Sequence, residues 1–346
     1  MQNTRFLKNY KALQVILILI FTIYPSITNA SEVNVYSGRK AKLIKPLLDQ
    51  FQNQTGIKVN LVTAKSDALI KRIESEGKSS PADILITVDA GRLDRAKKMD
   101  LLQSLSNLPV IKDIPKHYID KDNKWVALSK RIRTIVFSKE NIKNNYIKDF
   151  ADLANEEWNQ RICVRSSNNI YNQSLVASLI ANHGEKNTEK LIKRVVENFA
   201  RKPSGNDRSQ IKAVAKNECD IAIVNHYYYL IMLQSNDADQ REDANKVSLT
   251  FLNQESTGAH VNVSGIGITK YSKNLENARK LITFLLNKKS QEWYATANYE
   301  YPVLKSAKTN ELLESWGKVV LDEKSINQLG DLNSRAVKLM DRVGWQ

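Results

Sequence analysis

Two stretches of the chain repeat the same spacing between a cysteine and a tyrosine. Cys163 precedes Tyr171 by eight residues, and Cys219 precedes Tyr227, which Tyr228 follows directly, by the same eight. If the apolar runs beside the two cysteines are neighbouring parallel strands in step, the cysteines meet at one end. The tyrosines then converge beyond the other end, and open α/β sheets bind ligands outside the carboxyl ends of their strands. The spacing therefore predicts three phenols around one ligand site.

Three phenols are suited to a hard, highly charged cation. A tyrosine hydroxyl ionises near pH ~10 in water, and a bound metal supplies a field that favours the ionised form. Ferric iron prefers anionic oxygen, whereas soft metals prefer sulfur and zinc favours imidazole. Three phenolates would cancel the charge of one ferric ion. The alternative is half-buried aromatic packing, which the residues alone favour for the run YYYL (227–230).

Hydrophobic periodicity predicts the elements that position these residues. In the first part of the chain, strands are expected at VNVY (33–36), IKVNLVT (57–63) and DILITV (83–88). Helical spacing over residues 43–51 and a second helix capped by Ser66 lie between them. This alternation predicts a parallel sheet covered by helices on both faces.

After residue 124 the regular alternation of short strands and helices gives way to a long extended segment, which predicts a second lobe. WVALSKRIRTIVF (125–137) is longer than a usual strand, and HVNVSGIGIT (260–269) forms a second long candidate. RICV (161–164) and DIAIV (220–224) are short and apolar, as buried parallel strands are. A helix is expected over residues 278–297. The order fits two α/β lobes joined by one long strand out and another back.

The first thirty residues have the layout of a secretory signal peptide. A basic segment precedes an apolar run from Leu13 to Ile23, which breaks at Pro25, and cleavage is expected after Ala30. The apolar run is short for a membrane span, so we expect an exported protein that is not integral to a membrane. The formal charge is +15, and removal of the leader leaves about +12. The lysines are scattered without a basic aromatic ladder, so nucleic-acid binding is not expected.

Only two cysteines are present, Cys163 and Cys219. In an exported protein such a pair is more often a disulfide than a metal site, and the chain has neither CxxC nor HExxH spacing for zinc. No nucleophile elbow, paired carboxylates in a suitable context or metal-hydrolase motif is visible. The sequence therefore predicts a disulfide and no enzymatic activity, with an exported enzyme as a remote alternative.

The chain resembles periplasmic ferric-ion-binding proteins over essentially its whole mature length. The NxYY element and the RSSxNxYNQSL loop are specific to that family, whereas the GIKV and PAD pieces are common to the wider solute-binding superfamily. The segments that carry the resemblance are VNVYSGRK (33–40), QTGIKVNLVTAKSDAL (54–69), SPADILITVDAGRL (80–93), WVALSKRIR (125–133), RICVRSSNNIYNQSLVAS (161–178), ECDIAIVNHYYY (218–229), HVNVSGIGIT (260–269), EYPV (300–303) and the ending VKLMDRVGWQ.

The resemblance implies the two-lobed periplasmic-binding-protein fold, type II, an α/β fold with a hinge of two crossover strands. The expected organisation is a signal peptide (1–30), an N-terminal lobe (31–131 and 261–300) and a C-terminal lobe (132–260 and 301–346). Both lobes should close over a ligand by motion at the hinge.

The family's iron-ligating tyrosines match Tyr171, Tyr227 and Tyr228. Tyr229 is assigned to packing, because consecutive residues do not all face one metal easily. Many relatives also carry a His-Tyr pair after the first strand and an acidic ligand after the third, where this chain has Lys40-Ala41 and Val88. The resemblance therefore implies the subgroup in which three tyrosines and an exogenous anion hold the metal.

That anion, carbonate or another synergistic anion, needs positive charge and N–H donors. The family places an arginine near the metal in the hinge stretch, which matches Arg131, with Arg133 as the competing candidate. Lys40 is either a solvated charge or a contact for the anion. The residues expected around the anion, or behind the ligands, are Arg131, Arg39, Lys40, Ser167 and Asn168.

The function that the resemblance implies is capture of Fe(III) in the periplasm and delivery to the inner-membrane permease of an ABC transporter. The protein is expected to be a monomer. The main alternative is the same fold binding a polyamine, thiamine or an oxyanion, with the aromatic side chains used for stacking or hydrogen bonds.

Overall fold

The computed structural model describes residues 31–143, 146–323 and 326–346. The predicted signal peptide, residues 1–30, lies outside the described residues. Glu32–Gln346 form one compact unit by the contacts within it, and the description below concerns this unit. In the part of the chain described, no helix is both long and apolar enough to span a bilayer.

The unit alternates strands and helices in the order that the periodicity predicts. The strands are β1 (Glu32–Ser37), β2 (Lys58–Thr63), β3 (Ile84–Thr87), β4 (Val126–Ser138), β5 (Ile162–Cys163), β6 (Ile221–Asn225), β7 (Val247–Thr250), β8 (Ala259–Ile268), β9 (Tyr301–Pro302) and β10 (Leu321–Asp322). The helices are α2 (Lys45–Thr55), α3 (Ser66–Glu76), α4 (Ala90–Lys98), α5 (Ile170–His183), α6 (Glu185–Glu197), α7 (Asp207–Ala215), α8 (His226–Leu233), α9 (Ala238–Asn245), α10 (Leu275–Leu286), α11 (Lys288–Asn298), α12 (Glu311–Glu314) and α13 (Leu329–Arg342).

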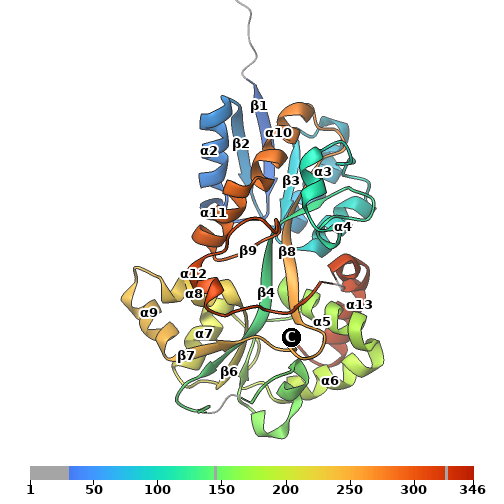
Figure 1. The fold of residues 1–346 in the computed structure, drawn as a ribbon. Coiled ribbons are helices and arrows are strands. Elements are labelled where there is room, and N and C mark those ends of the chain that lie inside the picture. The colour runs from blue at the N-terminus through green and yellow to red at the C-terminus, as the bar shows by residue number, and fades with distance from the viewer. Residues whose placement is uncertain (1–30, 144–145, 324–325) are drawn as a thin grey trace, which may run out of the picture. The chain divides into compact units, whose positions relative to one another are not determined.

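Two long antiparallel strands, β4 and β8, connect two lobes (Figure 1). The strand order is β2-β1-β3-β8-β4-β6-β5, in which β1, β2 and β3 are parallel to one another and β5 is parallel to β6. The first half of β4 pairs with β8, and its second half, from Arg133 onward, pairs with β6. One continuous strand therefore serves both lobes, which is the two-lobed α/β fold with two crossover strands that the sequence predicts.

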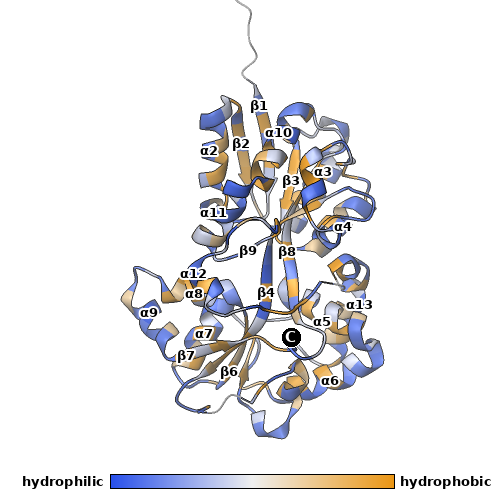
Figure 2. Cartoon of the chain, in the orientation of Figure 1, coloured by the Kyte–Doolittle hydropathy of each residue, from blue (hydrophilic) through white to orange (hydrophobic). Residues whose placement is uncertain are grey.

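Apolar side chains concentrate on the strands and on the helix faces that cover them. β3, β6 and β8 are buried along their whole length, as expected for strands with helices on both sides. Figure 2 shows that the middle of β4 is hydrophilic although it lies in the interior. There Arg131 and Arg133 are only 3% and 4% exposed. Buried charges of this kind need partners, and their partners define the site described below.

Two local expectations are wrong. The helix expected over residues 278–297 is two helices, α10 and α11, because the backbone of Asn287 is extended and its side chain caps α11 by accepting a hydrogen bond from the Ser290 N–H at 2.8 Å. Ser66 does not cap α3: the capping position is Lys65, and Ser66 is the first helical residue.

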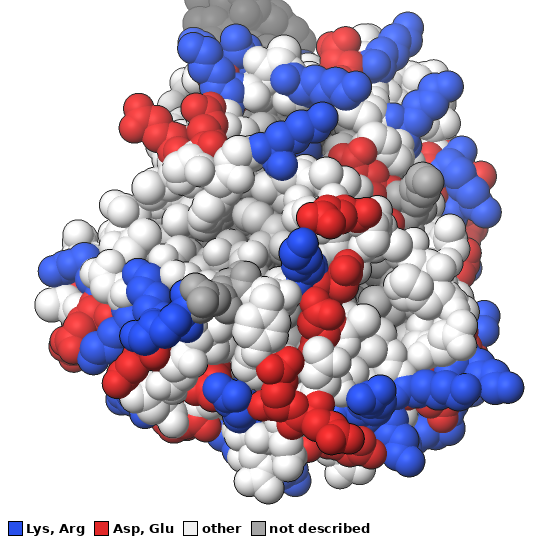
Figure 3. Space-filling view, turned by 60° about the horizontal axis from the view of Figure 1, so that its bottom comes forward, with Lys and Arg blue, Asp and Glu red and all other residues white. Residues whose placement is uncertain are grey.

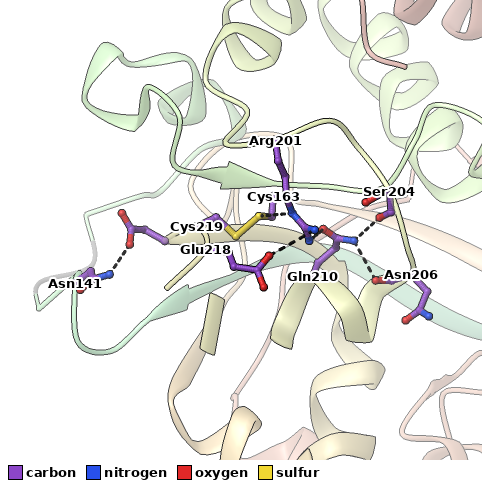
Figure 4. Close-up of a disulfide and its surroundings, with 9 residues drawn as sticks. Asn141, Cys163, Arg201, Ser204, Asn206, Gln210, Glu218 and Cys219 are labelled. Carbon is purple, nitrogen blue, oxygen red and sulfur yellow. Dashed lines mark hydrogen bonds and ion pairs between the residues drawn. A yellow bond between two sulfur atoms is a disulfide. The ribbon is translucent and has the colours of Figure 1, made fainter. Parts of the chain in front are cut away.

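The predicted disulfide between Cys163 and Cys219 is present (Figure 4). The two Cα atoms are 5.9 Å apart, and Arg201 donates a hydrogen bond to the Cys163 Sγ at 3.4 Å. β5 and β6 are parallel neighbours, as expected, but the register opposes Cys163 to Ala222 rather than to Cys219. The strands are therefore not in step: Cys163 lies within β5, whereas Cys219 lies two residues before the start of β6.

Replacing both cysteines by alanine should lower the free energy of unfolding by about 4 kcal/mol, because the bond closes a loop between residues 56 apart in sequence. Urea unfolding followed by circular dichroism measures the change, and a reducing agent should not destabilise the double variant further. A loss below about 1 kcal/mol would contradict a role for the bond in limiting the unfolded chain.

Candidate functional site

The three predicted tyrosines line one cavity. Tyr171 is the second residue of α5, and the side chain of Asn169 caps this helix by accepting a hydrogen bond from the Tyr171 N–H at 3.2 Å. Tyr227 and Tyr228 lie in the first turn of α8, which begins directly after β6. All three contribute to a cavity of about 950 Å³. Both helices thus start just beyond the carboxyl ends of neighbouring strands, where ligands of α/β sheets bind.

The phenols are close enough to influence one another's ionisation. The ring centroids of Tyr227 and Tyr228 are 4.3 Å apart. Burial, and then the neighbouring phenols, raise the pKa of Tyr227 far above its ordinary value. Burial and Tyr171 likewise raise the pKa of Tyr228, although Tyr227 and Arg165 act in the opposite direction. Without a cation between them, these two side chains are therefore neutral at ordinary pH.

Arg131, predicted near the metal, lies beside the tyrosines. Its guanidinium stands over the ring of Tyr171 at 5.4 Å from the centroid, and it donates a hydrogen bond to the Val88 carbonyl oxygen. Burial would lower the pKa of Arg131, but Tyr171, Glu300 and Tyr227 outweigh burial and raise it. Arg131 is thus a permanent positive charge against the tyrosine cluster.

Arg133, the competing candidate, has a different partner. Its guanidinium forms a buried ion pair with Asp207 and donates a hydrogen bond to the Asn172 Oδ1 at 2.5 Å. Asp207 also pairs with Arg165 at 2.6 Å and accepts a hydrogen bond from the Asn225 N–H at 3.1 Å. Burial would raise the pKa of Asp207, but the two arginines hold it below its ordinary value.

This network joins the segments that carry the tyrosines. Asn172 follows Tyr171 in α5, and Asn225 is separated from Tyr227 by one residue. Asp207 at the start of α7 connects both to β4 through Arg133. The network was not predicted, because no spacing in the sequence links residue 207 to either tyrosine segment. Its position shows that α5, β6 and α8 are held together behind the tyrosines.

The other predicted residues fall in two groups. Lys40 and Asn168 line the cavity with the tyrosines. Arg39 is buried in a different place, where it pairs with Glu300 at 2.8 Å and donates to the Ser264 Oγ at 2.8 Å. Ser167 is not among the residues that line the cavity; its carbonyl oxygen accepts a hydrogen bond from the Gln173 side chain at 2.9 Å.

Lys40 and Val88, the residues at the positions where many relatives carry ligands, both line the cavity. The neighbouring Asp89 was not singled out by sequence. Its carboxylate is buried and accepts hydrogen bonds from Asn262 in β8 and from the Ser174 Oγ in α5, the latter at 2.6 Å. Asp89 therefore connects the end of β3 to the helix that begins with the Tyr171 segment.

His226 belongs to the scaffold. Its Nδ1 accepts a hydrogen bond from the Ile132 N–H at 3.0 Å, and its Nε2 lies 2.8 Å from the Tyr299 carbonyl oxygen. Burial lowers the pKa of His226 to about 4, so the ring is neutral near pH 7. In the described ranges, no cluster of three or more His, Cys, Asp or Glu residues is arranged to hold a metal.

The cavity wall is rich in positive charge. Its lysines and arginines are Lys40, Lys42, Lys65, Arg92, Arg165 and Arg208, and Asp67 is the acidic residue of the wall. On the face shown in Figure 3, by comparison, lysines and arginines are interspersed with acidic side chains. A cavity of this kind favours anionic ligands.

Comparison with known proteins places this geometry in a family. Residues 79–327 match the model of the bacterial extracellular solute-binding proteins. The chain is 41% identical over 315 residues to iron uptake protein A1 of Synechocystis, covering 91% of this chain and 88% of that protein. It is 26% identical to the major ferric iron-binding protein of Neisseria meningitidis serogroup B, covering 91% of this chain and 94% of that protein.

Solved structures give the same result. A Trichodesmium protein in complex with iron and citrate ligands superposes with a TM-score of 0.87 at 41% identity, covering 91% of this chain and all (100%) of that one. The apo ferric ion-binding protein A of Pasteurella haemolytica superposes with a TM-score of 0.86 at 39% identity, covering 91% and 98%.

Asp207→Asn should lower the free energy of unfolding by about 3 kcal/mol, because it leaves two arginines facing a neutral side chain in the interior. The pKa of Asp207 is depressed, so its contribution is complete at neutral pH and declines as the pH falls through the pKa in the folded state. Urea unfolding at pH 7 measures the loss.

The matched control is Glu242→Gln, which removes an exposed ion pair with Lys246 and should change stability by less than about 0.5 kcal/mol. Equal effects of the two substitutions would contradict a central role for the Asp207 network.

Proposed function

The chain belongs to the bacterial extracellular solute-binding proteins, and from this premise we propose that it captures ferric iron in the periplasm and delivers it to the permease of an ABC transporter. The single observation that carries the proposal is the convergence of Tyr171, Tyr227 and Tyr228 on one cavity. The relatives named for iron uptake and ferric iron binding support the choice of metal.

In this proposal, the three tyrosines bind Fe(III) as phenolates. Three phenolates balance the charge of the ion, and hard anionic oxygen is the donor that ferric iron prefers. Arg131, over the Tyr171 ring, holds a synergistic anion such as carbonate that completes the coordination. Lys40 and Asn168, which line the same cavity, are the further candidates for anion contacts. Arg39, engaged by Glu300, supports the hinge.

Delivery requires the lobes to separate. We assign residues 31–131 and 261–300 to one lobe and residues 132–260 and 301–346 to the other, with β4 and β8 as the hinge. The helix α13 packs more extensively on α5 than on α4 of the first lobe, which supports placing the C-terminal segment with the second lobe. The protein is proposed to act as a monomer.

The main alternative is that the same fold binds a different solute. The positive charge of the cavity wall disfavours the cationic solutes among these candidates. Polyamines and thiamine are cations, and they would meet six lysines and arginines and the single acid Asp67 among the residues that line it. An oxyanion alone fits the charge but gives no reason for two adjacent phenols that line the same cavity as a third. Ferric iron with an anion accounts for both features.

Tyr227→Phe and Tyr228→Phe should each bleach or shift the visible charge-transfer band of the iron-loaded protein. Each should weaken iron binding by at least about tenfold, because an anionic ligand is lost. The matched control is Tyr229→Phe: Tyr229 packs against apolar residues and is not among those that line the cavity, so the band should persist. Competitive titration with ferric citrate, followed by absorbance, measures both the visible band and the affinity for iron. A colourless wild-type protein, or equal bleaching by all three variants, would refute the proposal.

Iron binding should release protons, because the pKa values of Tyr227 and Tyr228 are raised far above neutrality in the metal-free protein. The neutral phenols must deprotonate to ligate, so the apparent affinity should fall as the pH is lowered. Calorimetry in buffers of different ionisation enthalpy counts the protons, with at least two expected from these side chains. Binding without proton release would show that the phenols do not ligate as anions.

A further inference from the structure

The wall of the cavity that the first lobe contributes contains the start of α3. Lys65 and Ser66, the capping residue and the first residue of this eleven-residue helix, both line the cavity. The three tyrosines lie on helices of the second lobe. The start of α3 is thus a part of the cavity that the tyrosine ligands do not account for.

This helix start has unused hydrogen-bond donors. Lys65 provides no side-chain cap, and the N–H groups of residues 66, 67 and 68 make no hydrogen bond to the described residues. The first N–H groups of a helix carry partial positive charge and attract anions. Some helices of the chain have a side-chain cap, as α7 has Asn206 and α9 has Asp237, whereas α2 and α6, like α3, have none.

The hydroxyl of Ser66 is a second and independent indication of a ligand. Ser66 is only 7% exposed, and its Oγ is buried without a hydrogen-bond partner among the described residues. Leaving such a group unpaired is costly, so a partner is expected in the functional state. The hydroxyl lies over Gly38, where an added Cβ would come within 2.1 Å of it. Gly38 also lines the cavity, so the absence of a side chain there leaves room for the Ser66 hydroxyl.

The surrounding charge selects the sign of the ligand. Lys40, Lys42 and Lys65 line the same cavity and form no ion pair with the residues described. Asp67 is the acidic residue nearby, and its carboxylate is held by Arg92 at 2.7 Å and by Arg95 at 3.3 Å. The free charges at the start of α3 are therefore lysines, and a negatively charged group is the complementary ligand.

We propose that the N-terminus of α3, with Ser66 and Lys65, binds an oxyanion of an organic iron chelate while the tyrosines of the second lobe hold its ferric ion. The inference rests on the proposed function and specifies its cargo as an anionic chelate with a free carboxylate or phosphate group. A cavity of about 950 Å³ has room for such a chelate, whereas an iron atom with carbonate would fill a small part of it. The two lobes would recognise different ends of one cargo.

The test compares Ser66→Ala and Lys65→Ala with the wild-type protein, using three ferric sources: ferric citrate, ferric pyrophosphate and ferric iron with bicarbonate. Each substitution should weaken loading from a chelate with a free oxyanion by about three- to tenfold, as expected for one contact to a charged group. Loading with bicarbonate should be unchanged. The matched control is Lys71→Ala, an exposed residue of the same helix that is not among those lining the cavity.

The outcomes separate this inference from the function on which it rests. An effect on citrate alone assigns a carboxylate to α3, an effect on pyrophosphate alone assigns a phosphate, and an effect on both supports a general oxyanion site. Unchanged loading from both chelates, or an equal loss with bicarbonate, overturns the α3 site and leaves the tyrosine site intact. A wild-type protein that develops no visible band with any source overturns both.

Discussion

Charge balance among three phenols that line one cavity is the constraint on which the arrangement of the site depends. Tyr227 and Tyr228 are held close together, and burial raises the pKa of both. As anions the phenols would repel one another, and this repulsion together with burial keeps them neutral in the absence of a cation. In the proposed function a trivalent cation resolves this conflict, because its field stabilises all three anionic oxygens together.

The Asp207 network explains how the chain maintains this arrangement. Asp207 receives Arg133 from the hinge strand, Arg165 from the loop after β5, and the backbone N–H of Asn225 at the end of β6. A buried carboxylate with this set of partners is costly to disturb. It therefore fixes the relative positions of the segments that lead into the helices carrying Tyr171 and Tyr227, without itself lining the cavity.

The features that follow from hydrophobic periodicity and from the positions of strand ends could be predicted from the sequence. The roles of side chains that depend on partners far away in the sequence could not. The two lobes, the crossover strands, the disulfide and the convergence of the tyrosines were all predicted. The choice between Arg131 and Arg133 was left open because residues two apart lie on the same face of a strand. Only Asp207, which is far away in sequence, assigns Arg133 to the scaffold. Ser66 was misplaced because a serine before an apolar helical pattern is typical of a cap, whereas Lys65 takes that position.

The disulfide closes a ring of the chain that contains whole helices. The residues between Cys163 and Cys219 include Tyr171, the helices α5 and α6, and Asp207. One of the proposed ligands and the centre of the positioning network therefore belong to a covalently closed ring. If a single peptide bond inside that ring is hydrolysed, the two resulting pieces stay joined through sulfur. A protein built in this way can sustain a nick between α5 and Cys219 without losing either fragment.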